Sequence, residues 1–201
     1  MIAIIDYKAG NLASVKKALD HLQVEAVVTD DPRLASRADK VILPGVGHFA
    51  ATKELSRTGL CEAIRERIAA EKPFLGICVG MQWMLAGSSE APDVSGLGAI
   101  RANCERFQSN DLKVPHVGWN QIAKVRDSRL LAGIDSGSFV YYSHSYYVPM
   151  NAETVATSEY CGTYSAALEN DHLFGVQFHP EKSGQVGLRV LKNFCDLYHA
   201  E

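Results

Sequence analysis

Short apolar runs alternate with amphipathic stretches through the first 87 residues of the chain. Four runs are rich in Ile, Val and Leu, and we interpret them as strands: residues 2–7, 24–30, 40–47 and 73–78. Between them, apolar residues recur at three- and four-residue steps, as in the set Val15, Ala18, Leu19 and Leu22, which is typical of a helix. Apolar strands separated by helices predict an open, mostly parallel sheet with helices on both faces.

Two further helical patterns cover residues 48–71, and residues 79–86 predict a helix directly after the fourth strand. The turn-rich segment 88–98 then ends this alternation of predicted strands and helices. From about residue 100 to 170 the apolar runs are short and often alternate with polar residues, which predicts an antiparallel β insertion.

The last part of the chain returns to the first pattern. Residues 172–180 resemble a buried strand, and Ser183 can cap a closing helix. The apolar face of that helix would contain Val190, Leu191, Phe194, Cys195 and Tyr198. We therefore expect a single α/β domain over residues 1–201.

Composition narrows the possible function classes. The chain has 201 residues, 47% of them hydrophobic, and a net charge of −3, which argues against a nucleic-acid-binding surface. Its five cysteines form no CxxC pair and no histidine lies at a zinc-finger spacing, so we expect neither a disulfide framework nor a metal or other cofactor. Without a signal-type start or an apolar run of about 20 residues, a reduced, cytoplasmic location is expected.

Polar or small residues follow four of the predicted strands. The segments are DYKAGN, PGVG, GICVG and HPEKS. Because the carboxyl ends of parallel strands meet at one edge of a sheet, these segments predict an active site there.

Cys78 lies between Gly76 and Gly80 in the spacing of a nucleophile elbow, with sulfur in place of oxygen. The strained strand-to-helix turn leaves no room for side chains two residues away, and the following helix would point its positive end at the sulfur. A structural cysteine at an ordinary strand–helix junction is the alternative.

His179 and Glu181 supply the groups that such a cysteine requires. On an extended backbone they face the same side, so the imidazole can act as base and the carboxylate can orient it. An incidental ion pair in a surface turn is the alternative. Because a cysteine and a histidine both end strands of the same predicted sheet, we favour a catalytic triad.

The PGVG segment, residues 44–47, is the third candidate part of the site. Its glycines allow close approach to a ligand, so a backbone N–H of Val46 or Gly47 could join that of Val79 in an oxyanion hole. Taken alone, the segment could equally be a strand-ending turn.

The motifs GICVGMQ, PGVG and FHPEKS, in this order and spacing, resemble those of the class I (triad) glutamine amidotransferases. Within that family, PHVGWN at 115–120, SHSY at 143–146 and the AGN loop look like those of the glutaminase subunits of imidazole glycerol phosphate synthase. The resemblance covers essentially the whole chain. Val79 stands where the family more often has Leu, an exchange that a backbone donor tolerates.

The resemblance implies the chemistry. Cys78 would attack the side-chain amide of glutamine, His179 would protonate the departing ammonia, and water would hydrolyse the thioester. Gln82, Gly47 and the backbone of Ser143, His144 and Ser145 would bind the substrate. A surface position for Gln82 and a plain strand role for His144 are the alternatives.

The resemblance also implies a partner. Ammonia would pass to a (β/α)8-barrel cyclase subunit, which makes imidazole glycerol phosphate and aminoimidazole carboxamide ribotide in histidine biosynthesis. The matching motifs offer four interface candidates: Asn11, Trp119, Asn120 and Lys182. Trp119 could instead belong to the core of the insertion. The family further suggests that the PGVG donor stays turned away until the cyclase binds its ligand.

Three rival functions share parts of this pattern. A γ-glutamyl hydrolase or cysteine peptidase would use the same triad without a partner, but PHVGWN counts against it. A glutaminase of tryptophan or pyridoxal phosphate synthesis is disfavoured by AGN and PHVGWN. A flavodoxin-like binding module could use the acidic residues at 29–31, which we interpret as a turn that caps a helix before Pro32, and no nucleotide motif supports it.

Overall fold

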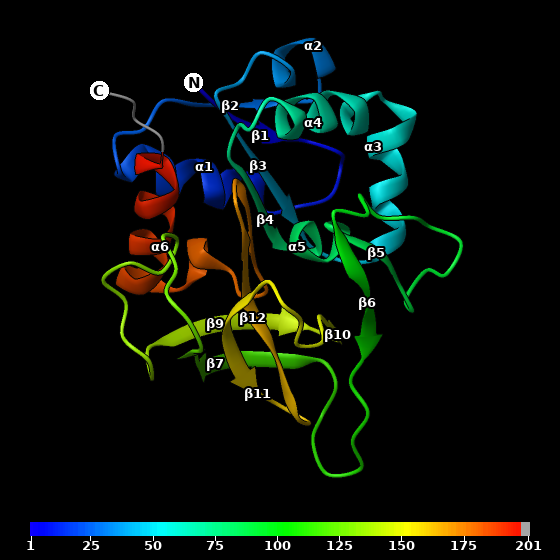
Figure 1. The fold of residues 1–201 in the computed structure, drawn as a ribbon, viewed down its shortest axis with the longest axis vertical. Helices are drawn as coiled ribbons and strands as arrows, with labels where there is room; N and C mark the ends of the chain where they lie inside the picture. The colour runs from blue at the N-terminus through cyan, green and yellow to red at the C-terminus, as the bar shows by residue number, and fades with distance from the viewer. Residues whose placement is uncertain (198–201) are drawn as a thin grey trace.

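The computed structural model describes residues 1–197, and an eight-stranded sheet organises it (Figure 1). The strand order is β2-β1-β3-β4-β13-β12-β11-β8, in which the first five strands are parallel to one another. These parallel strands are β1 (Ile2–Ile5), β2 (Ala26–Thr29), β3 (Lys40–Gly45), β4 (Phe74–Cys78) and β13 (Leu173–Val176). The predicted open, mostly parallel sheet is confirmed.

The antiparallel part of the chain continues the same sheet. It contributes β8 (Ala123–Lys124), β11 (Thr154–Glu159) and β12 (Thr163–Asn170), with β12 antiparallel to β13. The remaining strands form two small sheets: β7 (His116–Gln121) with β9 (Phe139–His144), and β5 (Leu85–Ser88) with β6 (Ile100–Arg106) and β10 (Tyr146–Tyr147). The predicted insertion is therefore partly an extension of the central sheet.

Helices flank the parallel half of the sheet. α1 (Leu12–His21) and α6 (Gly184–Asp196) pack together on one side, and α2 (Pro32–Ala35), α3 (Lys53–Arg57) and α4 (Leu60–Ala69) gather on the other (Figure 1). Two 3₁₀ turns, η1 (Phe49–Thr52) and η2 (Pro180–Lys182), and the short α5 (Val79–Trp83) complete the elements. No helix in the described residues is long and apolar enough to span a membrane.

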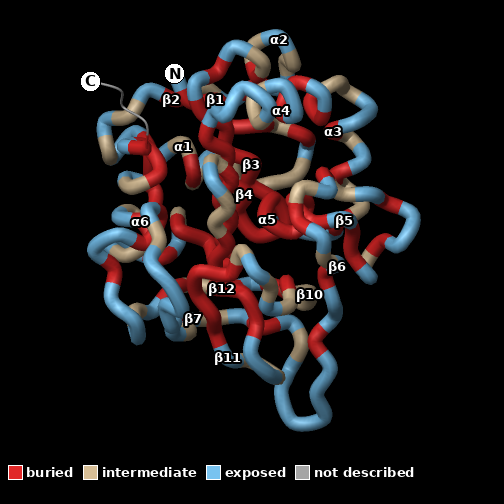
Figure 2. Tube along the Cα trace, viewed as in Figure 1, coloured by how far each residue is buried: buried red, intermediate tan, exposed pale blue. Residues whose placement is uncertain are grey.

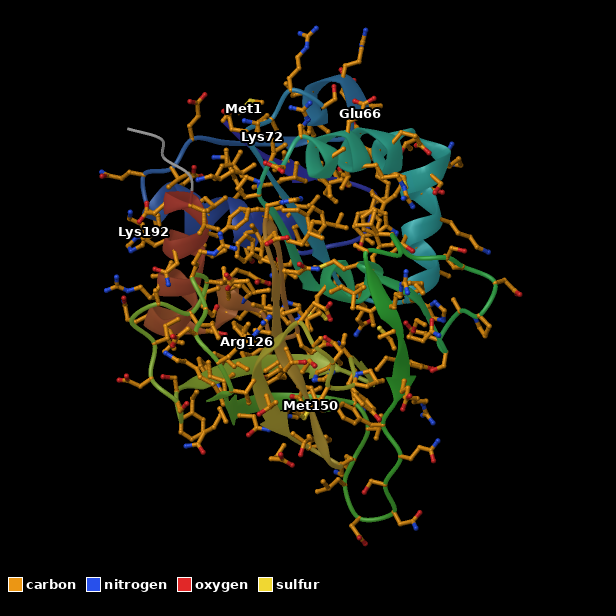
Figure 3. The ribbon with its side chains drawn as sticks, in the orientation of Figure 1. Met1, Glu66, Lys72, Arg126, Met150 and Lys192 are labelled. Carbon is orange, nitrogen blue, oxygen red and sulfur yellow. The ribbon has the colours of Figure 1, made fainter. Side chains whose placement is uncertain are left out.

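The core runs along the central strands. β1, β3, β4 and β13 are buried along their whole length, and the tube in Figure 2 is red through β3, β4 and α5. Met1 and Lys72, which precede two parallel strands, lie together at one end of the molecule, whereas Met150 lies toward the other end (Figure 3). The carboxyl ends of the parallel strands therefore face the antiparallel half.

Two sequence-based predictions need correction. The expected helix over 79–86 ends at Trp83, because Leu85 begins a strand that pairs with β6; a short apolar run does not distinguish the two states. Ser183 does occupy the N-cap position of α6, but its hydroxyl makes no cap bond and instead donates to the carbonyl of His179.

Two other expectations for the helices can be compared directly. Asp31 is the N-cap of α2 and accepts a hydrogen bond from the Arg33 N–H, as its position before Pro32 indicated. The apolar face of α6 is buried at Val190, Leu191, Phe194 and Cys195. Tyr198, predicted on the same face, lies outside the described residues.

Gly187 allows α6 to pack closely against the segment that carries His179 and Glu181. A Cβ atom at residue 187 would lie 1.9 Å from the Pro180 carbonyl oxygen. Helix propensity alone would favour alanine here by about 1 kcal/mol, so the close packing against Pro180 accounts for the glycine.

We predict that Gly187→Ala lowers the free energy of unfolding in urea by about 2 kcal/mol or more. Gln185→Ala, at an exposed position of the same helix, is the control. Unchanged or increased stability of Gly187→Ala would contradict the prediction.

Candidate active site

Cys78 ends β4 and turns the chain into α5 with a positive φ of 53° and ψ of −107°. Neighbouring backbone leaves no space for side chains around this turn. A Cβ at Gly76 would lie 2.4 Å from the Gly80 carbonyl oxygen, and one at Gly80 would lie 1.9 Å from that of Leu43. Both glycines are therefore required by close backbone contact. α5 has only five residues and the Cys78 side chain makes no cap bond to it, so the expected stabilisation of the sulfur by a helix dipole is small.

His179 and Glu181 reach the same edge from the adjacent strand. β13 pairs directly with β4, and His179 follows β13. The Nδ1 atom of His179 lies 3.0 Å from Oε1 of Glu181, and both side chains are buried. The contact was expected, but its reason differs: Glu181 lies in the 3₁₀ turn η2, which folds the carboxylate back onto the ring.

Backbone and side-chain bonds hold this histidine in place. Its N–H donates to the Tyr141 carbonyl at 2.9 Å, and its carbonyl accepts from Ser183 Oγ at 2.7 Å. Asn11 donates to Oε1 of Glu181 at 3.3 Å. The second carboxylate oxygen, Oε2, is one of the few buried polar atoms among residues 1–197 without a hydrogen-bond partner.

Electrostatics favour a protonated His179. Burial lowers its pKa, but the hydrogen bonds and charges of Cys78 and Glu181 outweigh burial and raise the pKa to about 10. The ring is therefore an imidazolium at neutral pH, paired with sulfur on one side and carboxylate on the other. In this state the histidine can donate a proton to a leaving group.

A cavity of about 220 Å³ opens beside Cys78. The predicted residues that line it are Gly47, Val79, Gln82, Ser143, His144 and Ser145. Glu90, Pro115 and Tyr146 also line it, and none of them was predicted. Glu90 lies in the turn-rich segment 88–98, where the sequence offers no periodic pattern that would single it out.

Two of the three candidate oxyanion residues, Gly47 and Val79, line this cavity, whereas Val46 does not. Gly47 has a φ of +89°, and Val46 is 37% exposed. Gly45 leaves space for Tyr7, whose hydroxyl would lie 2.6 Å from a Cβ at residue 45. Residues 44–47 thus pack tightly at their start and are open at their end. The oxyanion role of Val46, Gly47 and Val79 stays a prediction.

Gln82 is buried rather than on a helix surface. Its Nε2 atom donates to the Tyr146 carbonyl at 2.9 Å and to Oε1 of Gln177 at 3.2 Å. Gln177, which sequence reasoning missed, is fully buried and places its own Nε2 3.6 Å from the sulfur of Cys78.

His144 belongs to a buried pair with His116. Nδ1 of His116 lies 3.2 Å from Nε2 of His144, whose Nδ1 lies 2.9 Å from the Tyr146 carbonyl oxygen. Burial lowers the pKa of His116 to about 4 and that of His144 to about 3. Both rings are neutral at pH 7, and both ring nitrogens of His144 have partners, so its side chain is part of the wall.

The four interface candidates differ in exposure: Asn11 and Asn120 are half-buried, whereas Trp119 and Lys182 are exposed. Asn11 donates to Oε1 of Glu181. Trp119 is 56% exposed and touches the edge of the Tyr141 ring, so a core position is wrong. Lys182 is exposed with its Nζ 5.6 Å from the centre of the Tyr141 ring, and Asn120 donates to the Glu159 carbonyl at 2.9 Å.

An exposed apolar strip follows the β7–β9 sheet. It contains Val117, Trp119 and Phe139, which are 53–57% exposed, and Tyr141, the register partner of Trp119. β9 supplies Ser143, and β7 begins directly after Pro115; both residues line the cavity. The strip is therefore continuous with the candidate active site.

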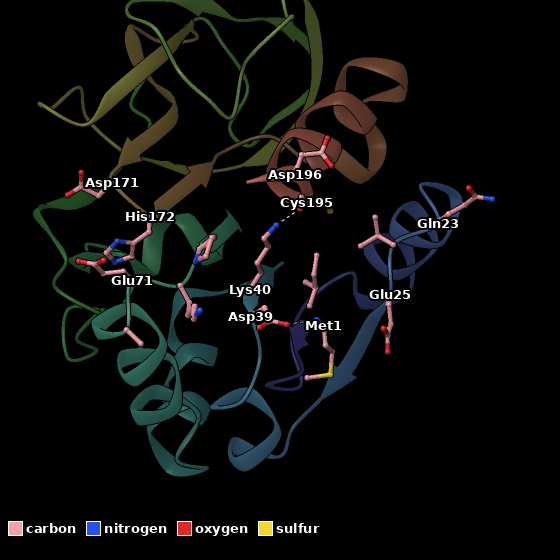
Figure 4. A pocket seen from close by; sticks show the side chains of 15 residues that line it. Met1, Gln23, Glu25, Asp39, Lys40, Glu71, Asp171, His172, Cys195 and Asp196 are labelled. Atoms are coloured by element: carbon pink, nitrogen blue, oxygen red, sulfur yellow. Dashed lines mark hydrogen bonds and ion pairs between the residues drawn. The ribbon is translucent and has the colours of Figure 1, made fainter. Parts of the chain in front are cut away.

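A second, larger cavity of about 910 Å³ lies at the opposite edge of the sheet (Figure 4). Lys40 is buried there, and its Nζ donates to the carbonyl of Cys195 near the end of α6, which accounts for its burial. Burial lowers the pKa of this lysine. Cys78, His179 and Glu181 do not line this cavity. Among residues 1–197 no group of three His, Cys, Asp or Glu side chains could hold a metal ion.

Comparison with known proteins adds independent findings. The family described as glutamine amidotransferase class-I matches residues 3–197. A curated relative from Syntrophotalea carbinolica, "Imidazole glycerol phosphate synthase subunit HisH", is 47% identical over 98% of this chain and 100% of its own. The protein of the same name from Methanothermobacter thermautotrophicus is 45% identical over 100% of both chains. A solved structure titled "Crystal structure of glutamine amidotransferase" has a TM-score of 0.76 at 17% identity, covers 96% of this chain and 97% of its own, and supports the fold.

The buried histidine pair predicts acid sensitivity. Because its folded pKa lies below the unfolded value of about 6.5, His116 contributes stability above pH 6.5 that is lost as the pH falls toward 4. Between pH 7 and pH 5 this loss is roughly 1–2 kcal/mol. Urea unfolding at both pH values should show a smaller pH difference for His116→Gln than for the unchanged protein. An equal difference would contradict the prediction.

Proposed function

The chain belongs to the class I glutamine amidotransferases and, within them, to the family of imidazole glycerol phosphate synthase subunit HisH, and we propose that Cys78 is its glutaminase nucleophile. The enzyme hydrolyses glutamine to glutamate and ammonia in histidine biosynthesis. The observation that carries the proposal is the meeting of Cys78, His179 and Glu181 at one sheet edge, beside a cavity.

In the first half of the reaction, the thiolate of Cys78 attacks the carbonyl carbon of the substrate's side-chain amide. The imidazolium of His179 donates its proton to the amide nitrogen, the C–N bond breaks, and ammonia leaves a thioester. The now neutral ring then takes a proton from water as the water attacks the thioester. Glutamate departs, and the thiolate–imidazolium pair is restored. Glu181 orients the ring throughout.

Backbone groups stabilise the negative oxygen of both tetrahedral intermediates. The N–H of Val79 follows the nucleophile directly, and a second donor comes from Gly47, which lines the cavity, or from Val46 beside it in the chain. The positive φ of Gly47 suits a peptide that changes orientation, as expected if the donor turns inward only when the partner binds its ligand.

The rest of the cavity binds the amino-acid end of glutamine. Glu90 supplies a carboxylate for the substrate ammonium, and the backbone of Ser143 to Ser145 holds its carboxylate. Both N–H groups of Gln82 have protein partners, so its free carbonyl oxygen can accept a hydrogen bond from the substrate.

Ammonia is consumed by a partner subunit, which we propose is a (β/α)8-barrel cyclase that forms a heterodimer with this chain. We propose residues 1–201 as one amidotransferase domain, with the ammonia acceptor site on the partner. The exposed strip at Val117, Trp119 and Phe139, with Lys182 nearby, suits the docking surface. The free cysteines of the described chain fit a reducing cytoplasm.

Cys78→Ala should abolish glutamine-dependent turnover, by at least about 10⁴-fold, and spare ammonia-dependent synthesis by the complex, because only the thioester step needs sulfur. His179→Asn should act similarly. Glu181→Gln should lose about 10–100-fold less, because the carboxylate orients the ring without entering the chemistry. Glutamate release and product formation from ammonium salt measure the two activities. Retained glutamine-dependent turnover in Cys78→Ala would defeat the assignment, and a Glu181→Gln loss equal to that of Cys78→Ala would disprove its lesser role.

Trp119→Ala should weaken binding to the cyclase subunit by about 10-fold or more, because an exposed aromatic anchor is lost from the strip. Met150→Ala removes a similarly exposed apolar side chain, 52% accessible, outside the strip and is the control. Titration calorimetry with the purified partner measures both. Equal affinity for Trp119→Ala and the unchanged protein would place the interface elsewhere.

A further inference from the structure

Gln177 offers a second hydrogen bond to the nucleophile. It lies between β13 and His179, it is 0% exposed, and its backbone N–H donates to the Ala166 carbonyl at 2.9 Å. Its Nε2 atom is 3.6 Å from the sulfur of Cys78. The proposed mechanism assigns no role to this amide.

Chemistry fixes the orientation of the amide. The Tyr146 carbonyl can only accept hydrogen bonds, so the Gln82 atom 2.9 Å from it must be the NH₂ nitrogen. The second N–H of that nitrogen points to Gln177 at 3.2 Å, which must therefore present its oxygen. The NH₂ group of Gln177 is then left facing the sulfur.

The same carbonyl also fixes the histidine pair. His144 must donate to Tyr146 through Nδ1, so its Nε2 accepts from Nδ1 of His116. On the far side, Nε2 of His116 lies 3.5 Å from the amide nitrogen of Asn120, next to the exposed Trp119. His116 thus donates to His144, and His144 donates to the Tyr146 carbonyl. Nε2 of His116 is left to accept from Asn120.

We infer that Gln177 is a further catalytic residue, whose amide donates a hydrogen bond to the sulfur of Cys78, and that Gln82 and His144 are positioning residues for it. The inference rests on the proposed function only in taking Cys78 as nucleophile. His179 loses and regains a proton in each cycle, whereas an amide donates at every stage. Gln177 therefore stabilises sulfur both as the attacking thiolate and as the group expelled when water cleaves the thioester.

Other ionisable groups also influence the sulfur, and the test must leave them unchanged. They come from several elements: His179 and Glu181 beside η2, Tyr7 after β1, Cys104 in β6, and Glu90 in the cavity wall. Substitutions at Gln177 and Gln82 retain all five side chains. Gln177→Met and Gln82→Met also add no charge, so altered sulfur reactivity in those two variants reports on the amides.

The experiment measures alkylation of Cys78 by iodoacetamide in the full chain from pH 5 to pH 9, with the modified peptide quantified by mass spectrometry. Gln177→Glu places a carboxylate against the sulfur, so alkylation at pH 7 should slow at least about tenfold and its pH profile should move to higher pH. Gln177→Met removes the donor without adding a charge, so the alkylation profile should also move to higher pH and glutamine turnover should fall about 10–100-fold. Gln185→Glu, on the exposed surface of α6, is the matched control and should change neither.

Gln82→Met tests the positioning role without adding a charge near the sulfur. A thioether donates to neither Tyr146 nor Gln177, so the amide at residue 177 loses its fixed orientation and the alkylation profile should again move to higher pH. An unchanged alkylation profile in Gln177→Met, with urea unfolding like that of the control, would overturn the inference whatever Gln177→Glu shows. A change in Gln177→Met but not in Gln82→Met would overturn the positioning role. Failure of the proposed function appears separately, as glutamine turnover by Cys78→Ala.

Discussion

Parallel pairing of β4 with β13 is the constraint on which the site depends. The register places Ile77 beside Val176, so the two strands end together and deliver Cys78 and His179 to the same edge. Close packing then sets the details. Glycine at residue 175 admits the Met81 side chain, which lies 2.7 Å from the position of an added Cβ, and the glycines around Cys78 admit backbone. The reactive pair is thus a product of sheet geometry.

Much of this arrangement could be predicted because strand ends carry a local signal. Apolar runs that stop at small or polar residues identified the strands of Cys78 and His179, and parallel topology brings such ends together. The exposed position of Trp119 illustrates the limit of that reasoning. Alternation in β7 indicates a two-faced strand, but it does not say which face another part of the chain covers.

The unpredicted features depend on contacts that are distant in sequence. Gln177 acquires its orientation from Gln82 and the carbonyl of Tyr146, and no spacing rule joins those three positions. Glu181 reaches His179 because η2 tightens the chain, whereas a two-residue step suggested an extended backbone. Leu85 enters a strand because β6 pairs with it, although the local pattern also suits a helix. In each case tertiary structure selects among locally permitted states.

The separation of Cys78 from its imidazolium partner along the chain has a consequence for biosynthesis. Residue 78 leaves the ribosome long before residue 179, and β13 must insert beside β4 before the two side chains can meet. Until then the cysteine has no neighbouring cation and behaves as an ordinary thiol. Late completion of the sheet thereby delays the pairing of sulfur with imidazolium until the chain is nearly complete.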